Sequence, residues 1–111
     1  MSNEARNTAF TRTADWLGAF ATAPQAAGWA REAVVFVRAL AAHGPVAVLA
    51  KVQISPDGVT WVDEGTSFTL PYSVDEITFA KVRHFGGWLR IVGVLPPDAS
   101  LRAAVTIDLK A

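Results

Sequence analysis

The sequence predicts an all-β domain: an antiparallel β-sandwich of jelly-roll or immunoglobulin-like topology with an N-terminal arm. Short segments of alternating or β-branched residues recur along its 111 residues. Gly, Pro and Asp mark a turn about every 8 to 12 residues, and no long amphipathic helical pattern occurs, which together are typical of sandwiches. A chain of this length buries one hydrophobic core. We therefore expect a single domain, with an arm and edge strands at residues 1–30 and the sandwich core at residues 31–111.

The first segment, residues 1–30, predicts an arm with one or two short edge strands. It is rich in Ala and Thr, and Pro24 and Gly28 interrupt any long helix. Its aromatic residues stand singly among small ones, at Phe10, Trp16, Phe20 and Trp29.

Two strands joined by a turn follow the arm. Residues 32–40 are β-branched and aromatic, and they are too uniformly apolar for an amphipathic helix. The turn at residues 43–45, His-Gly-Pro, ends this segment. Residues 46–55 then alternate between apolar and mixed positions, which predicts a second strand. The apolar positions on one of its faces are Val46, Val48, Ala50, Val52 and Ile54.

The clearest turn in the sequence joins this strand to the next one. In Ser55-Pro56-Asp57-Gly58 the proline supplies a φ of about −65° and the glycine supplies a left-handed residue, as in a type I turn followed by a bulge. Pro56, Asp57 and Gly58 are therefore predicted to be structural turn residues. The returning strand, residues 59–63, places Trp61 in phase with Val59, and we expect Trp61 in the core.

Four further segments complete the predicted sandwich: residues 67–70, 76–83, 88–95 and 101–110. In the second of these, Ile77 and Phe79 face the same way. In the third, Leu89 and Ile91 lie opposite Trp88 and its neighbours. The last segment alternates strictly and is typical of a half-buried antiparallel strand. Its apolar positions are Leu101, Ala103, Val105, Ile107 and Leu109.

Two of these strands, residues 34–40 and 88–94, are apolar on both faces. The outer face of a two-layer sandwich is usually polar, so the second apolar face must be covered by the arm or by another chain. We expect contacts with partner chains through the following residues: Phe10, Trp16, Phe20, Trp29, Val35, Val37, Trp88, Val92 and Val94.

Charge and hydropathy exclude several classes of partner. Ten basic residues balance ten acidic ones, so no net field attracts nucleic acid or anionic lipid. The longest uncharged runs, residues 16–30 and 39–50, contain Pro and Gly and fall short of the ~18 apolar residues that a membrane span needs. The first residues lack the basic and apolar pattern of a secretion signal. We expect no nucleic acid, membrane or secretion.

The chain offers little catalytic chemistry. It contains no cysteine, which excludes disulfides and thiolate sites. Its two histidines, His43 and His84, lie beside glycine-containing turns and are interpreted as loop and strand-end residues. Four loop carboxylates lack the spacing of a calcium-binding loop: Asp57, Asp63, Glu64 and Asp75. We therefore expect no enzyme activity, cofactor or metal.

A glycan- or protein-binding module is the alternative class of function. An exposed tryptophan face can stack on a sugar ring, and Trp16, Trp29 and Trp88 are the candidates for such a surface. This hypothesis requires an exposed tryptophan in a groove beside polar side chains.

Two stretches carry a resemblance to known proteins: Val52-Gln53-Ile54-Ser55-Pro56-Asp57-Gly58-Val59-Thr60-Trp61 and Phe85-Gly86-Gly87-Trp88-Leu89-Arg90-Ile91-Val92. They resemble small β-sandwich proteins of tailed phages and prophages, in which a Ser-x-Asp-Gly-x-x-Trp hairpin precedes an aromatic-x-Leu-Arg-Val strand. The resemblance covers roughly residues 32–110 and brings no catalytic residues with it. It implies a virion structural component.

The leading hypothesis is therefore a non-enzymatic structural protein, such as a capsid-decorating, tail or shell component. Its expected partners are copies of itself or other structural chains of a particle. The expected location is a virion or a cytoplasmic assembly.

Overall fold

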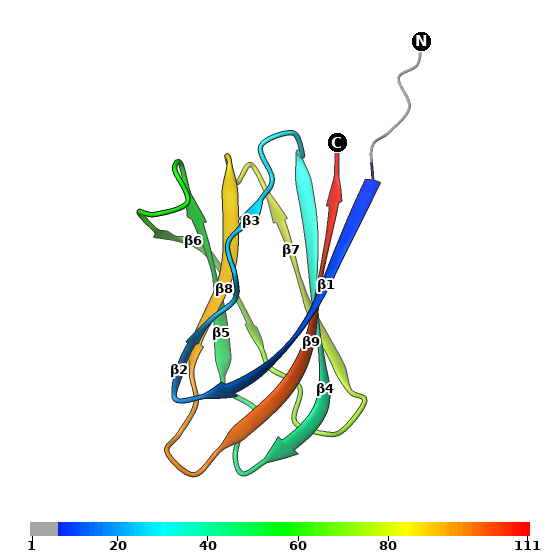
Figure 1. Ribbon diagram of the computed structural model, residues 1–111, viewed down its shortest axis with the longest axis vertical. Helices are drawn as coiled ribbons and strands as arrows, with labels where there is room; N and C mark the ends of the chain where they lie inside the picture. Colours follow the sequence, from blue (N-terminus) through cyan, green and yellow to red (C-terminus); the bar gives the residue numbers. More distant parts are fainter. Residues whose placement is uncertain (1–6) are drawn as a thin grey trace.

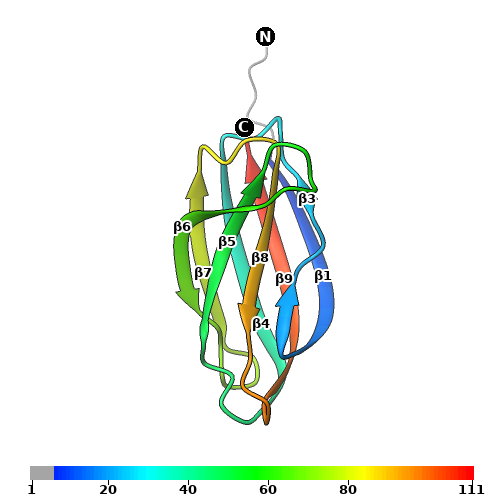
Figure 2. The ribbon, with the colours of Figure 1, turned by 90° about the vertical axis from the view of Figure 1, so that its left-hand side faces the viewer.

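The computed structural model describes residues 7–111, which form nine β-strands in two packed sheets (Figures 1 and 2). Every strand pairing is antiparallel, and no helix occurs among these residues. The predicted all-β sandwich is confirmed. The strands are β1 (Asn7–Leu17), β2 (Ala19–Ala21), β3 (Gln25–Ala26), β4 (Glu32–His43), β5 (Leu49–Ser55), β6 (Val62–Thr69), β7 (Ile77–Arg83), β8 (Trp88–Val94) and β9 (Ser100–Lys110).

The strand order is that of a jelly roll. The first sheet has the order β1-β9-β4-β7, and the second has β2-β8-β5-β6 with β3 also paired to β8. The chain passes from one sheet to the other at most connections, so strands that are neighbours in the sequence seldom pair. This order of strands in the two layers is the Greek-key order of a jelly roll, with β3 as an addition to the second layer, and it decides between the two predicted topologies.

The segment predicted as an arm contributes strands to both sheets. Within the described residues, β1 runs antiparallel to β9 from the pair Asn7 and Lys110 to the pair Leu17 and Ser100. Gly18, with a φ of +53°, then turns the chain across to β2 in the second sheet. Residues 1–6 of the predicted arm lie outside the described residues.

The core lies between the sheets and follows the alternation of the strands. The inward side chains of β9 are the five apolar ones that the sequence indicates, and Leu89 and Ile91 are buried on β8 as expected. On β7 the inward positions are Ala80 and Val82, so Ile77 and Phe79 share the outer face.

Three residues predicted as partner contacts are core residues of the chain itself. Val35 and Val37 are fully buried, because the inward face of β4 comprises the odd-numbered positions from 33 to 39. Trp16 is only 4% exposed. The prediction was wrong for all three, since side chains packed inside the sandwich cannot also contact another chain.

Trp16 is buried through a stack with another aromatic residue of the N-terminal segment. Its ring lies parallel to that of Phe20, with the centroids 4.0 Å apart. Phe20 pairs with Gly93 of β8, and a Cβ at Gly93 would stand 2.7 Å from Phe20 Cζ. The absence of a side chain at Gly93 therefore makes the space in which the Phe20 ring lies against Trp16.

We expect the substitution Gly93→Ala to lower the free energy of unfolding by about 1–3 kcal/mol, because the new methyl group must displace the Phe20 ring. Thermal and denaturant unfolding would measure the loss. Gly28→Ala is the matched control, since a Cβ there would have its nearest neighbour at an ordinary 3.9 Å. Equal stability of the two variants would contradict this account of the stack.

Candidate interaction surfaces

The outer face of the first sheet carries an exposed group of apolar side chains, here called the apolar patch. Phe36 and Phe79 are partners in the register of β4 and β7, and their ring centroids are 6.2 Å apart. Ile77 is 51% exposed and Phe79 is 53% exposed. Side chains of this size are usually buried, so their exposure makes this face a candidate interaction surface. The patch comprises Val34, Phe36, Leu40, Ile77 and Phe79.

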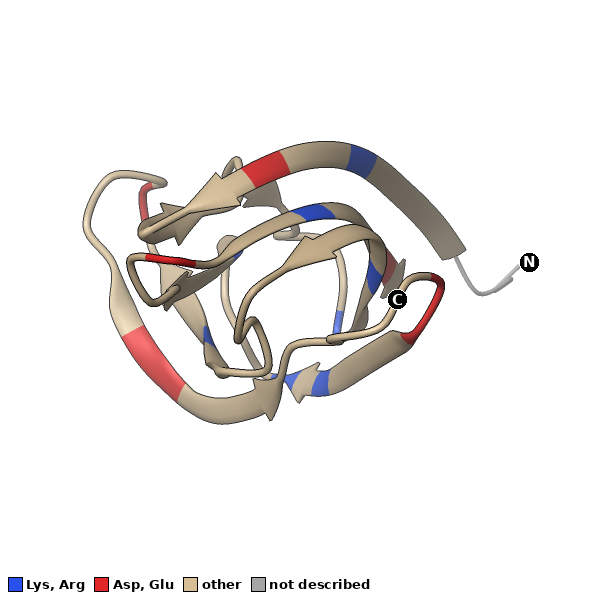
Figure 3. Cartoon of the chain, turned by 90° about the horizontal axis from the view of Figure 1, so that it is seen from below, with Lys and Arg blue, Asp and Glu red and all other residues tan. Residues whose placement is uncertain are grey.

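An ion pair lies at each end of the apolar patch. Arg38 pairs with Asp75 at 2.9 Å, and Arg83 lies 3.9 Å from Glu32. These side chains are largely exposed, and such pairs add little to the stability of one chain. Figure 3 shows that both signs of charge are spread around the sheets and are not gathered on one side.

A third pair on the same sheet joins its edge strand β1 to the neighbouring strand β9. Arg102 of β9 donates from Nε to Oδ1 of Asp15 on β1 at 2.8 Å. This hydrogen bond lowers the pKa of Asp15 and raises that of Arg102.

The described part of the N-terminal segment does not cover the apolar patch. β1 lies in the plane of the first sheet beside β9, while β2 and β3 belong to the second sheet. Of the two coverings that the sequence allows, the one by residues 7–30 of the same chain is therefore wrong. Within the part of the chain that the structure describes, the patch faces solvent.

The outer face of the second sheet holds a broad open groove of about 720 Å³, here called the polar groove. Arg90 Nε donates to Gln53 Oε1 at 2.9 Å, and Gln53 Nε2 donates to Asp63 Oδ1 at the same distance. Lys51 Nζ lies 3.7 Å from Asp63 Oδ2. The polar side chains of β5, β6 and β8 thus form one connected row across the sheet.

Trp61 belongs to this outer surface and not to the core. It is half-buried, and its ring lies against the guanidinium of Arg90, with Cζ 4.3 Å from the ring centroid. The predicted phase with Val59 was wrong because residues 56–61 form a loop and β6 begins only at Val62. Val59 is 80% exposed in that loop.

The loop after β5 is held by side-chain hydrogen bonds to its backbone. The hydroxyl of Ser55 accepts from the N–H of Asp57 and Gly58, at 3.2 and 2.8 Å. Oδ1 of Asp57 accepts from the N–H of Val59 and Thr60, both at 2.8 Å. The bonds from Thr60 and Val59 are the main reason that the pKa of Asp57 falls to about 2. Gly58 adopts a φ of +80°, as the turn requires.

The other predicted contact residues divide between core and surface. Phe10, Phe20 and Trp29 are half-buried and pack against the core. Trp88 is half-buried, and its ring stands 3.2 Å from where a Cβ of Gly58 would be. Val92 and Val94 line the polar groove, and Val94 is 67% exposed.

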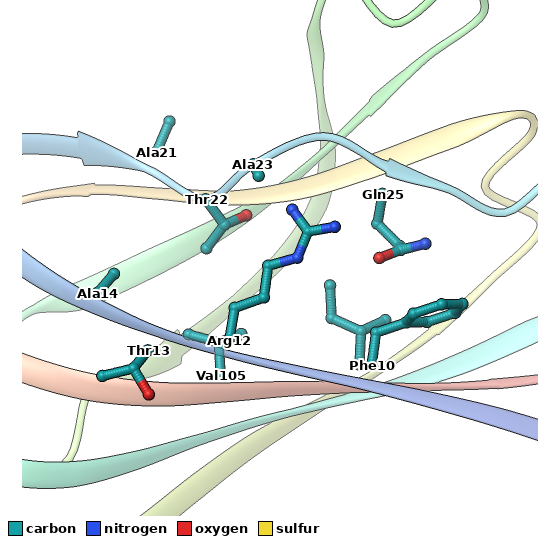
Figure 4. A pocket seen from close by; sticks show the side chains of 10 residues that line it. Phe10, Arg12, Thr13, Ala14, Ala21, Thr22, Ala23, Gln25 and Val105 are labelled. Carbon is teal, nitrogen blue, oxygen red and sulfur yellow. The ribbon is translucent and has the colours of Figure 1, made fainter.

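A small cavity of about 160 Å³ separates β1 from the segment that joins β2 to β3 (Figure 4). Phe10 and Arg12 enter it from β1, and Thr22 and Gln25 lie on the opposite wall. Most of its lining is apolar.

Sequence reasoning predicted an apolar outer face on the strand at residues 34–40, but it named the wrong side chains of that strand and did not connect it with Ile77 and Phe79. Val34 and Phe36 stand on the opposite face of β4 from Val35 and Val37. Ile77 and Phe79 share a face of their strand in the same way.

The histidines and the loop carboxylates stay apart from one another. His43 ends β4 and His84 follows β7, and neither makes a hydrogen bond to a carboxylate among residues 7–111. In the same residues, no group of three or more His, Asp or Glu side chains could hold a metal ion. The described part of the chain also has no helix long and apolar enough to cross a membrane.

We expect Asp57→Asn to weaken the fold at neutral pH and to matter less in acid. A carboxylate whose pKa is lowered from 3.8 to about 2 stabilises the fold above pH 3.8, and this contribution is lost as the pH falls through about 2. The difference in melting temperature between the native chain and the variant should therefore shrink from neutral pH to pH 2.

Asp98→Asn removes a carboxylate from a different loop and is the matched control for this comparison. The control should show the same loss of stability in acid as the native chain. A constant difference between native and Asp57→Asn chains at all pH values would contradict the role of these hydrogen bonds.

No protein-family model matches the sequence, and no curated protein matches it. Among solved structures, the fold is similar to that of a chain from Bacillus endospore appendages, described as a novel family of disulfide-linked pili. The alignment covers 96% of this chain and 90% of that chain, with 14% sequence identity and a TM-score of 0.50. At this identity the likeness establishes a shared fold, which agrees with the jelly roll described above.

Proposed function

We propose that this protein is a non-enzymatic structural subunit that assembles with copies of itself, using the apolar patch as a contact between subunits. The observation that carries the proposal is the exposure of Phe79 and Ile77 on β7, the edge strand of a sheet whose outer face the described N-terminal strands leave open. Burying that face against another chain removes aromatic and aliphatic surface from water, at about 25 cal/mol per Å².

The charges around the patch favour a second copy as its occupant. Each side of the patch carries both a cation and an anion: Arg38 with Asp75 at one end, and Arg83 with Glu32 at the other. A copy related by a two-fold axis can place each of these charges against an opposite one. The 111 residues also balance ten basic with ten acidic side chains, so long-range repulsion does not oppose self-association.

Two likenesses support an assembly of this kind. One solved structure with a similar fold comes from Bacillus endospore appendages, described as disulfide-linked pili, and pili are assemblies of repeated subunits. The second likeness is the resemblance of the hairpin sequence to phage and prophage proteins. From it we propose that the assembly is a virion, in which this chain is a capsid-decorating, tail or shell component, and that it is built in the cytoplasm. The pili are described as disulfide-linked, whereas these 111 residues contain no cysteine. The contacts that they make therefore involve no disulfide bond.

We expect Phe79→Glu to abolish or strongly weaken self-association, because it places a charge in the middle of the apolar patch. The measurement is the mass in solution by light scattering over a concentration series. The native chain should form oligomers or polymers, and the variant should need at least about tenfold more protein to do so.

Val59→Glu is the matched control, since Val59 is 80% exposed in a loop of the other sheet. Circular dichroism would establish that both variants fold. A native chain that remains monomeric at high micromolar concentration, or a Phe79→Glu chain that assembles as the native one does, would refute the proposal.

A further inference from the structure

The polar groove lies on the opposite side of the sandwich from the apolar patch, and the proposed assembly makes no use of it. It extends over the outer face of the second sheet, from the row of polar side chains on β5, β6 and β8 to an apolar end at Leu49, Val92 and Val94. Two features of this groove bear on what it binds: the way its arginine is held, and the arrangement of polar and apolar surface.

Arg90 is fixed in position by two neighbours. The ring of Trp61 lies against its guanidinium at 4.3 Å, which is a cation–π contact. Its Nε donates to Gln53 Oε1 at 2.9 Å. Because the guanidinium is planar, these two contacts also fix the direction of its remaining N–H groups. The arginine is thus oriented before any ligand arrives, which lowers the entropy lost on binding.

The charge of Arg90 has no counterion in the described chain. The carboxylate of the row, that of Asp63, accepts from Gln53 and pairs with Lys51 at 3.7 Å. Within residues 7–111, neither Nη atom of Arg90 has a hydrogen-bond or ion-pair partner. An oriented guanidinium with two unused donor atoms matches the two oxygens of a carboxylate, which it binds in a bidentate manner.

The rest of the groove suits a sugar ring. Lys51, Gln53 and Asp63 present both donors and acceptors, as hydroxyl groups require. The valines and leucine at the other end offer an apolar surface for the C–H groups of the sugar ring. The side chains of Ala19 and Ala21 are small, so the wall of the groove on that side is shallow. The volume of about 720 Å³ lies in the range of ligand sites, and the groove is open along its length. An oligomer can therefore lie across the strands.

We propose that the polar groove binds an acidic oligosaccharide, with the carboxylate of a uronic acid residue on Arg90 and the neighbouring hydroxyls on Gln53 and Asp63. The site differs from the tryptophan stacking surface that the sequence offers as an alternative. Trp16 is buried, and the ring that takes part, Trp61, supports the arginine and does not stack on the sugar. The proposal stands independently of self-assembly, which uses the other sheet.

The test is calorimetric titration of the native chain with oligogalacturonate and with its methyl ester, which has the same backbone without the charge. We expect saturable binding of the acid and at least about tenfold weaker binding of the ester. Arg90→Lys keeps the positive charge but loses the planar fork, and it should weaken binding of the acid by about tenfold or more. Tryptophan fluorescence should change with saturation, because Trp61 lies beside Arg90.

Arg31→Lys is the matched control variant, because Arg31 is an exposed arginine in the connection before β4, outside both the polar groove and the apolar patch. It should bind oligogalacturonate as the native chain does. Comparison of the two ligands on the native chain keeps the test valid if a variant folds poorly.

Several results would overturn the proposal. One is the absence of saturable binding at millimolar oligogalacturonate, and others are equal affinity for the methyl ester or unchanged affinity in Arg90→Lys. Polyglutamate that binds as tightly as the sugar acid would assign the groove to an acidic peptide instead.

Discussion

The pairing of β9 with β1 on one side and β4 on the other is the interaction on which the rest of the sandwich depends. It joins the last strand of the chain to the first over the full length of β1, from Asn7 to Leu17. On its inner side, β9 buries Leu101, Val105 and Leu109 against the second sheet. A shift of one residue would turn all of these side chains outward, so the alternation of β9 fixes the register of both neighbours.

The sequence predicts such a strand well because one of its faces is apolar and the other is mixed. The same reasoning fails for β4, where both faces are apolar and alternation cannot say which one is inside. Val35 and Val37 are buried, whereas Val34 and Phe36 face outward beside β7. That choice depends on which strands flank β4 and which sheet lies beneath it, and both are properties of the fold and not of the local pattern.

Trp61 shows a second limit of local pattern. The turn residues at 55–58 are recognisable from their types, but the length of the loop is set by Asp57. Its carboxylate binds the N–H groups of Val59 and Thr60 and thereby keeps them out of the sheet. β6 then begins at Val62, and Trp61 meets Arg90 on the outer surface. The cation–π contact and the groove beside it therefore depend on side-chain hydrogen bonds, which the alternation of apolar and polar residues along the sequence does not reveal.

The jelly-roll order places the two candidate surfaces on opposite sides of one thin molecule. The apolar patch belongs to β4 and β7, and the polar groove belongs to β2, β5, β6 and β8, so no strand serves both. In Figure 2 the second sheet faces the viewer and the first sheet lies behind it. Subunits that pack through the first sheet would therefore leave the second sheet directed outward. Such an assembly would present many copies of the sugar site. A long acidic polysaccharide could then bind several grooves at once, which raises the overall affinity through multivalency while the affinity of each groove stays the same.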